Sequence, residues 1–291
     1  MRIFINLYLL YTLSACTNVL EVNDMMYKPQ IVVNSLFTND STWTVRLTKS
    51  RSILAETQTS FEPIENARVV IADADGQIID TLMPSYDHLF RFRYRGSLKP
   101  TIGGRYTILV ETAFGMVTAS SNVPEPVQIA SVQTDSSQVG SDGLGVEVNI
   151  LFEDPKTEKN LYAIRMIRKK FQVNESDTLR FVEDVAFEPI DPALQNNQSS
   201  RLTTLFNDNL FNGKEHFVRL RIKSDSNLGI TESVIIVLFS VSEDYYDYFI
   251  EKNLQDDIRE DPFAQPVEVS TNVKNGLGIF AGYSSSSFTI Q

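Results

Sequence analysis

Apolar and polar residues alternate with a period of two along much of the chain from residue 30 onward, as in the Trp-Thr-Val-Arg-Leu-Thr run of residues 43–48. This is the period of a β-strand with one buried face, because successive side chains point to opposite sides of the strand. About seven such runs, separated by turn residues, lie between residues 30 and 124. That spacing is typical of an immunoglobulin-like β-sandwich, and we expect one over residues 30–124.

Two segments of this region predict further features, a turn and an aromatic face. Residues 73–76, Asp-Ala-Asp-Gly, follow an apolar run and predict a β-hairpin turn. Phe90, Phe92 and Tyr94 alternate with three arginines, which predicts an aromatic inward face and a cationic outward face. We therefore expect all three rings to point into the sandwich.

The sequence Val-Pro-Glu-Pro at residues 123–126 predicts a domain boundary. Proline cannot donate to a β-ladder, and the polar stretch at 133–142 that follows cannot form a core. Residues 125–291 then form a second β-domain, with a long surface loop at 189–200 and an apolar central strand at 234–239. The predicted fold is mainly β, with two β-sandwich-like domains.

One helix is predicted, over residues 242–258, in the second domain. Ser242 can cap its N-terminus, and Glu243 and Asp244 suit the positive end of the helix dipole, while Pro262 ends the helix. Apolar residues recur at three- and four-residue spacing, and we expect this stripe to pack on the sheet rather than in a partner's groove. The stripe consists of Tyr246, Phe249, Ile250, Leu254 and Ile258.

The N-terminal segment resembles a bacterial lipoprotein signal. Arg2 precedes an apolar run over residues 3–13, and two small residues lead into Cys16. The run is too short to span a membrane, which takes about 20 apolar residues. We expect residues 1–15 to be a signal peptide and Cys16 to carry fatty-acyl groups such as palmitate. Two or three chains anchor a protein firmly, since each buried methylene contributes about 0.8 kcal/mol, and residues 16–29 are then a tether.

Composition narrows the classes of function. The formal net charge is −11, and it becomes −12 after removal of the signal peptide, whose only charged residue is Arg2. An acidic chain of this kind lacks the clustered positive charge that binds nucleic acid or docks a protein on anionic lipid. Cys16 is the only cysteine, so its acylation leaves no thiol for a disulfide, a metal site or catalysis. An ordinary secreted protein with a chance cysteine is the alternative.

No pattern of catalytic or metal-binding residues is present, and we expect no catalytic residue, metal or cofactor. The two histidines, His88 and His216, lie far apart in sequence and lack metal-ligand spacing. Residues 73–76 are similar to the start of a calcium loop, but Pro84 stands where the closing Glu belongs. We therefore predict a protein that is not an enzyme.

Three polar segments are interpreted as supporting the backbone. Glu153 and Asp154 are adjacent and should point to opposite faces of a strand, which separates them as an acid–base pair. Residues 207–209, Asn-Asp-Asn, are expected to cap turns, with calcium ligation as the alternative. The Asn-Gly pair at 275–276 suits a turn with positive φ, and Gly278 permits close approach of another strand, with a ligand contact as the alternative.

Three tripeptides are similar to the acceptor sequence for periplasmic O-glycosylation. Each begins with aspartate and has serine or threonine in second place. The motif is short and arises by chance, so occupancy stays open. The candidate acceptors are Ser41, Thr81 and Thr178.

Several segments resemble those of a known family. The most specific is residues 272–284, Asn-Val-Lys-Asn-Gly-Leu-Gly-Ile-Phe-Ala-Gly-Tyr-Ser, which is similar to the family's terminal signature. This is the domain-of-unknown-function family numbered 4249, outer-membrane lipoproteins of the Bacteroidota. The similarity extends from Cys16 to the C-terminus, although Leu161 stands where an aromatic residue is usual. The other matching segments are residues 152–155, 160–162, 206–214 and 242–246.

The resemblance implies an accessory role beside a TonB-dependent transporter that carries a carboxypeptidase-like regulatory domain. The expected function is that of a lipid-anchored, non-enzymatic binding subunit of the bacterial outer membrane. One alternative is a capture module for glycans or peptides, for which an exposed Trp43 or Tyr283 would be a sign, although its alternation places Trp43 in the core. The other is a structural or assembly factor of the outer membrane. Which face of that membrane the protein occupies stays open.

Overall fold

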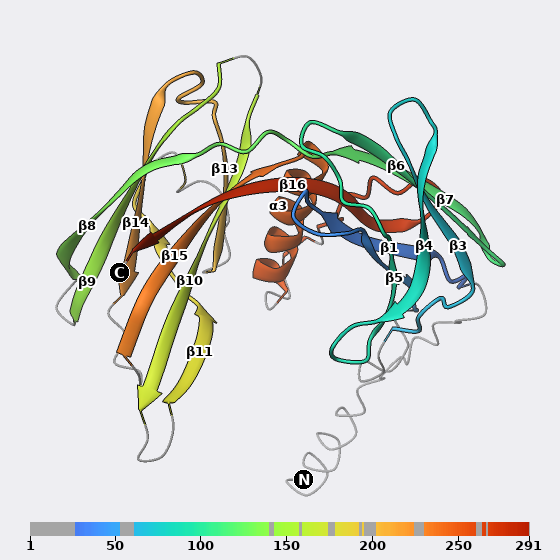
Figure 1. Ribbon diagram of the computed structural model, residues 1–291, viewed down its shortest axis with the longest axis horizontal. Helices are drawn as coiled ribbons and strands as arrows, with labels where there is room; N and C mark the ends of the chain where they lie inside the picture. The colour runs from blue at the N-terminus through green and yellow to red at the C-terminus, as the bar shows by residue number, and fades with distance from the viewer. Residues whose placement is uncertain are drawn as a thin grey trace, which may run out of the picture. The chain divides into compact units, whose positions relative to one another are not determined.

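The computed structural model describes residues 27–52, 61–139, 143–156, 159–173, 178–191, 194, 202–223, 230–259, 264–265 and 267–290 (Figure 1). The chain divides into two units, of which the first is described only at residues 27–29 and 51–52. The second unit, Gln30–Ser50 with Phe61–Gln291, contains every strand and the helix discussed below. The predicted signal peptide, Cys16 and Pro262 lie outside the described residues.

Seven strands form between residues 30 and 124, at the places that the alternating runs predict. They are hydrogen-bonded in the order β1-β2-β5-β4-β3-β6-β7. Their inward side chains form one hydrophobic core, in which Trp43, Tyr94 and Ile108 are fully buried. The strands are β1 (Ile31–Phe37), β2 (Thr44–Lys49), β3 (Ala67–Ala72), β4 (Ile78–Tyr86), β5 (Phe92–Arg95), β6 (Arg105–Thr112) and β7 (Gly115–Asn122).

The later strands build a second core between two sheets. Strands β11, β10, β15 and β16 continue the large sheet, with β13 beside β10, and β12, β14, β9 and β8 form a four-stranded sheet. Phe152 from one sheet and Tyr162 and Ile236 from the other are fully buried together. The predicted mainly β, sandwich-like fold is confirmed. The strands are β8 (Ile129–Val139), β9 (Gly143–Glu153), β10 (Leu161–Val173), β11 (Thr178–Asp184), β12 (Glu188–Pro189), β13 (Thr203–Asn207), β14 (Glu215–Lys223), β15 (Ile230–Val241) and β16 (Leu277–Ile290).

The helix α3 (Glu243–Ile258) packs on the large sheet, as predicted. The Ser242 hydroxyl caps it by accepting a hydrogen bond from the N–H of Tyr245 at 3.3 Å. No residue of α3 is fully buried, so the helix forms an outer layer on that sheet. Its half-buried side chains Tyr246, Phe249 and Ile250 pack against a small cluster made of Leu161, Ala163, Leu205 and Val241.

The long strand β16 belongs to both cores (Figure 1). Residues 277–282 pair in parallel with β1, whereas residues 283–290 pair antiparallel with β15. Phe280 is fully buried in the first core, and Ile290 packs against the second. One strand therefore supplies a hydrogen-bonded neighbour to each half of the fold.

The residues just before β16 close the first core. Thr118 of β7 and Lys274 exchange backbone hydrogen bonds of 3.4 and 2.7 Å, which brings the far edge of the sheet back toward β16. The Asn272 side chain acts as a further strand partner. Its Nδ2 donates to the carbonyl of Phe280 at 2.7 Å, and its Oδ1 accepts from the Phe280 N–H at 3.0 Å. The segment that resembles the family's terminal signature is thus the closing segment of the first core.

Gly278 permits the close approach of a neighbouring strand, as predicted. Its φ is +99°, and a Cβ at this position would collide with the carbonyl oxygen of Val33 on β1. Asn275 supplies the positive φ of the predicted Asn-Gly turn, at 61°. Both residues serve the backbone.

One prediction is wrong, and one strand is longer than the sequence pattern indicates. Phe90 does not point inward: it lies in the turn after β4, and 87% of its surface is exposed. The Asp87 side chain forms this turn, because it accepts hydrogen bonds from the N–H groups of Leu89 and Arg91. The polar stretch that begins at residue 133 is partly a strand, which the sequence pattern does not indicate. Residues 133–139 belong to β8, since an edge strand that pairs with β9 on one side needs no apolar face.

The predicted division at residues 123–126 stays a prediction. Two hydrophobic cores do lie on either side of it, but Phe280 and its neighbours on β16 pack in the first core. Val127, directly after the prolines, is also held in place. Its N–H donates to Ser240 Oγ at 3.2 Å, and its carbonyl accepts from Ser286 Oγ at 2.6 Å.

We predict that Gly278→Ala lowers the free energy of unfolding by about 3 kcal/mol or more, because left-handed backbone strain adds to a clash with a buried carbonyl. Gly76→Ala is the matched control, since Gly76 also has a positive φ, 79°, but open space around a Cβ; we expect a loss of about 1 kcal/mol there. Urea unfolding of both variants measures the difference. Equal losses would contradict the role given to Gly278.

Candidate functional site

Strand β11 is an exposed edge. It pairs with β10 alone in the described part of the chain, and all 7 of its residues are exposed. Its apolar side chains are uncovered, with Phe181 at 43% and Val182 at 70% exposure. An exposed edge strand with apolar side chains is a template for pairing with a strand from another chain. β11 is therefore well suited to bind an extended segment of a partner.

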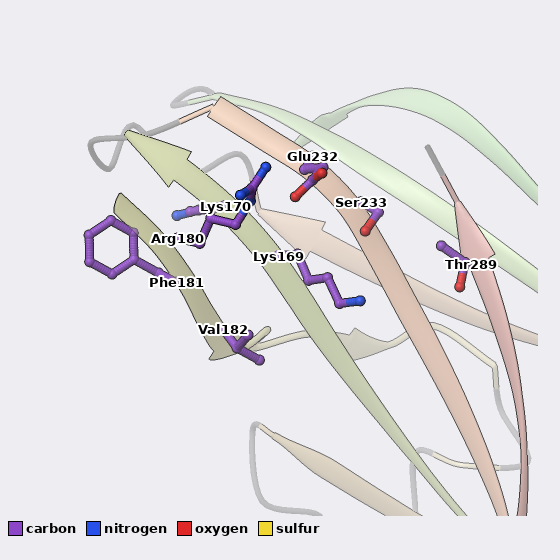
Figure 2. Close-up of a pocket in the computed structure, with 8 residues that line it drawn as sticks. All are labelled: Lys169, Lys170, Arg180, Phe181, Val182, Glu232, Ser233 and Thr289. Carbon is purple, nitrogen blue, oxygen red and sulfur yellow. The ribbon is translucent and has the colours of Figure 1, made fainter. Parts of the chain in front are cut away.

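A surface cavity of about 450 Å³ lies beside β11. Figure 2 shows the Lys169 side chain in the space between β10 and β15, with the Phe181 ring turned away from the other lining residues. Three cations and one carboxylate line the cavity, so an acidic group is the complementary ligand. The lining residues are Lys169, Lys170, Arg180, Phe181, Val182, Glu232, Ser233 and Thr289.

Most charges on β10 and β11 are paired with one another. Arg165 donates two hydrogen bonds to Asp184, at 2.6 and 2.8 Å, and these raise the pKa of Arg165 and lower the pKa of Asp184. The Nζ of Lys170 lies 2.7 Å from Oε1 of Glu183. Lys169 and Arg180 make no ion pair within the residues that the structure describes. These two side chains are therefore the cations in this cavity that are available to a ligand.

A second cavity of about 450 Å³ lies at the β4–β5 hairpin, lined in part by Arg91, Arg93 and Arg95. The cationic outward face that the sequence predicts is thus present on β5. Asp87 Oδ2 lies 2.8 Å from a guanidinium nitrogen of Arg91 and 2.8 Å from one of Arg93. Burial would raise the pKa of Asp87, but hydrogen bonds from the N–H groups of Arg91 and Leu89 and from both guanidinium groups outweigh it and hold that pKa below its usual value.

Asp154 is a buried carboxylate with a structural role. Its Oδ1 accepts from the Tyr162 hydroxyl at 2.5 Å, and its Oδ2 accepts from the N–H of Gly213 at 2.8 Å. Burial raises the pKa of Asp154 against the effect of these hydrogen bonds, and burial also raises the pKa of Tyr162. The neighbouring Glu153 is exposed, so the two carboxylates face apart, as predicted.

Residues 207–209 cap turns, as predicted. Asn207 Oδ1 accepts from the N–H of Asn209 at 3.1 Å, and Asp208 Oδ2 accepts from the N–H of Asn160 at 2.9 Å. The first bond forms the turn within the segment, and the second joins the segment to the residue before β10. Among the described residues, no group of three or more His, Cys, Asp or Glu side chains could hold a metal ion.

The two histidines occupy different surroundings. His88 is exposed in the β4–β5 turn. His216 on β14 stacks on the Phe211 ring with the ring centroids 3.9 Å apart, and its Nε2 lies 2.8 Å from Asp191 Oδ2. No spacing in the sequence indicates this histidine–carboxylate pair, because its members come from separate segments. Its aromatic and largely buried surroundings make it part of the second core.

The predicted modification sites stay predictions. Cys16 lies outside the described residues, and no helix in the described part is long and apolar enough to cross a membrane. Trp43 is fully buried, and Tyr283 is half-buried against Phe239 and Tyr245, so neither is an exposed platform for a sugar ring. The candidate glycosylation acceptors are exposed: Ser41, Thr81 and Thr178.

Sequence reasoning missed β11. Its only signal is the pair Leu179 and Phe181, two residues apart, which is too short a run to separate a strand from a loop. The edge position that makes β11 a candidate site is a property of the sheet order, which no local pattern contains.

Comparison with known proteins gives one family. The family model described as a domain of unknown function, DUF4249, matches residues 18–289. No curated protein matches the chain. A crystal structure of bovine butyrophilin aligns with 7% sequence identity and a TM-score of 0.23, covering 73% of this chain and 92% of that one. A likeness this low carries no argument.

We predict that Asp154→Ala lowers the free energy of unfolding by about 3 kcal/mol, because the Tyr162 hydroxyl and the Gly213 N–H lose a buried acceptor. Asp154→Asn is the control, since an amide keeps an acceptor oxygen and cannot ionise. The raised pKa of Asp154 means that its stabilising effect is fully present below the ordinary aspartate pKa and is lost as pH rises through the folded-state value.

The wild-type free energy of unfolding, measured relative to that of Asp154→Asn, should therefore fall as the pH rises above about 4, the ordinary pKa of aspartate. Denaturant unfolding at a series of pH values measures this difference. If this difference stayed constant or rose with pH, burial would not be the dominant influence on the pKa of Asp154.

Proposed function

We propose that this chain, which belongs to the DUF4249 family, is a lipid-anchored, non-enzymatic accessory subunit of the bacterial outer membrane that binds a TonB-dependent transporter. The family's description names no activity, so the proposal is built from the sequence and the surface. The lipobox-like segment that ends at Cys16 supports the anchor. The resemblance to outer-membrane lipoproteins of the Bacteroidota supports the location and the transporter.

The observation that carries the binding role is the exposed edge of β11. In strand addition, main-chain hydrogen bonds supply affinity and pockets for alternate side chains supply specificity. Within the described residues β11 pairs with β10 alone, and Val182 and Phe181 offer apolar contacts. Arg180, which lies on β11 itself and lines the adjacent cavity, is the cation beside which an acidic side chain of the added strand would lie. An extended acidic segment of the transporter is the partner that fits.

The surroundings of the buried carboxylates also support binding rather than catalysis. Asp154 accepts hydrogen bonds from Tyr162 and Gly213. Asp80 accepts from the N–H groups of Ser97 and Leu98, each at 2.9 Å. Carboxylates held in this way stabilise loops and strands. A catalytic site, in contrast, needs titratable groups that converge on a substrate.

One alternative has support from the same edge. A module that captures extended peptides without a transporter would also use β11. A glycan platform built on Trp43 has no such support, because that ring is fully buried. Recovery of bound peptides in the absence of the transporter distinguishes peptide capture from the accessory role.

We expect the acylated wild-type protein to recover the transporter from detergent-solubilised membranes of cells that make both. Val182→Glu should reduce that recovery, because a charge on an edge strand opposes strand addition and a carboxylate repels an acidic segment. Ile78→Glu, at a site on β4 with 54% exposure, is the matched control and should recover as much as the wild type. Equal recovery by the two variants would contradict the role of β11. Recovery of the wild-type protein alone would contradict the proposal.

The anchor has its own test. The intact mass of the mature protein should exceed that of bare residues 16–291 by the mass of the acyl groups and of any O-linked glycan. Cys16→Ser should remain uncut or leave the membrane fraction. A mass equal to the bare polypeptide would refute both modifications, and normal maturation and fractionation of Cys16→Ser would refute the anchor.

A further inference from the structure

Two consecutive hairpins of the first core contain the same turn. In the β3–β4 turn, Asp73 Oδ1 accepts from the N–H groups of Asp75 and Gln77 at 3.1 and 2.9 Å. The N–H of Gly76 donates to the Asp73 carbonyl at 3.1 Å. This pattern requires a positive φ at the fourth residue, and Gly76 supplies it at 79°.

The β4–β5 turn repeats this pattern with a different fourth residue. Asp87 Oδ1 accepts from the N–H groups of Leu89 and Arg91 at 2.9 and 3.0 Å, and the N–H of Phe90 donates to the Asp87 carbonyl at 2.9 Å. Phe90 has a φ of 57°, which is an outlier for a bulky residue. Its ring is 87% exposed, so packing does not compensate for the strain. Because Gly76 satisfies the same turn without strain, folding alone does not explain a phenylalanine here.

The β4–β5 turn lies at the end of the first core where the chain enters β1. Ile31, at the start of β1, pairs with Lys49 at the end of β2. Because β2 and β5 are antiparallel, the end of β2 lies toward the start of β5. Phe92, at that start, pairs with Tyr86 at the end of β4. The predicted tether therefore joins the core at the same end as the turn that carries Phe90.

Further exposed apolar side chains gather at this end. Phe114, in the β6–β7 turn, lies here because the Lys49 Nζ is 4.6 Å from its ring centroid. Arg91 and Lys49 are the adjacent cations, and the carboxylates nearest to them are held in ion pairs, Asp87 with Arg91 and Glu62 with Lys49. The exposed fractions are 61% for Tyr86, 58% for Leu89, 87% for Phe90 and 58% for Phe114, and we call these four residues the tip surface.

We infer that the tip surface inserts shallowly into the bilayer that holds the acylated Cys16, an inference that rests on the lipid anchor of the proposed function. Aromatic and aliphatic side chains flanked by arginine and lysine suit the membrane interface, where rings lie at headgroup level and cations meet phosphates. A tether of 14 residues, 16–29, spans at most about 50 Å, so the bilayer is within reach. A protein partner is less well matched, because stable protein interfaces use about 20–30 residues a side.

The mature chain's net charge of −12 opposes anionic surfaces, whereas the tip surface depends on apolar contact, so the insertion suits a bilayer of zwitterionic lipid. Phosphatidylcholine vesicles are therefore the appropriate probe. Cys16 is the only cysteine and is blocked by acylation, so a second cysteine is a unique labelling site.

The test places an environment-sensitive fluorophore on Phe90→Cys in the acylated full mature protein, bound to phosphatidylcholine vesicles. Leu98→Cys is the matched control: Leu98 is 48% exposed and follows the end of β5, which pairs with the start of β2 at the other end of the sandwich. We expect the label at position 90 to shift its emission to shorter wavelength and to be quenched by a lipid-borne quencher. The label at position 98 should do neither. Leu89→Cys provides a second site on the tip surface if Phe90→Cys does not fold.

A water-exposed label at positions 89 and 90, on acylated protein that is bound to the vesicles, overturns the inference and leaves the anchor standing. A protein of bare mass that does not bind vesicles overturns the anchor, and the inference with it. Phe90→Gly tests the strain separately. It should raise the midpoint of thermal unfolding, since glycine meets the φ that the turn requires, and a lowered or unchanged midpoint would contradict the argument from the two turns.

Discussion

The pairing of β16 with both β1 and β15 is the interaction on which the rest of the fold depends. Without β16, β1 would keep only β2 as a neighbour and β15 would keep only β10. The parallel half of this pairing is possible because Gly278 lets the backbone approach Val33. Asn272 then bonds the Phe280 backbone, and Lys274 pairs with β7, so the first core closes only when the end of the chain is in place.

This arrangement connects the proposed anchor to the proposed partner site through one sheet. The predicted tether precedes β1, and the sheet continues through β16, β15 and β10 to the exposed edge of β11. Backbone hydrogen bonds therefore join the strand nearest the proposed anchor to the strand that we propose for binding the transporter. The tip surface lies at the end where the tether enters, so a membrane contact there would hold the first core by two attachments rather than one.

Sequence patterns predicted the features that depend on interactions between residues close together in the chain. Ser242 caps the helix because its hydroxyl meets an N–H three residues on, and Asp73 forms its turn within five residues. Phe90 was assigned to the wrong face because the period of two was extended into a turn, where Asp87 sets the backbone. The polar part of β8 was missed because an edge strand does not need an apolar face. The candidate edge β11 and the shared strand β16 depend on the order of strands in the sheet, which pairs residues far apart in sequence and leaves no local signal.

Native-state hydrogen exchange on the intact mature chain tests most directly whether β16 joins the two cores into one cooperative structure. The amides of β1 and β15 that bond to β16 should open with the same free energy, close to that of global unfolding, because both strands lose a partner when β16 leaves. If the β1 amides exchanged through an opening of much lower free energy than those of β15, the cores would be independent and the account would be contradicted.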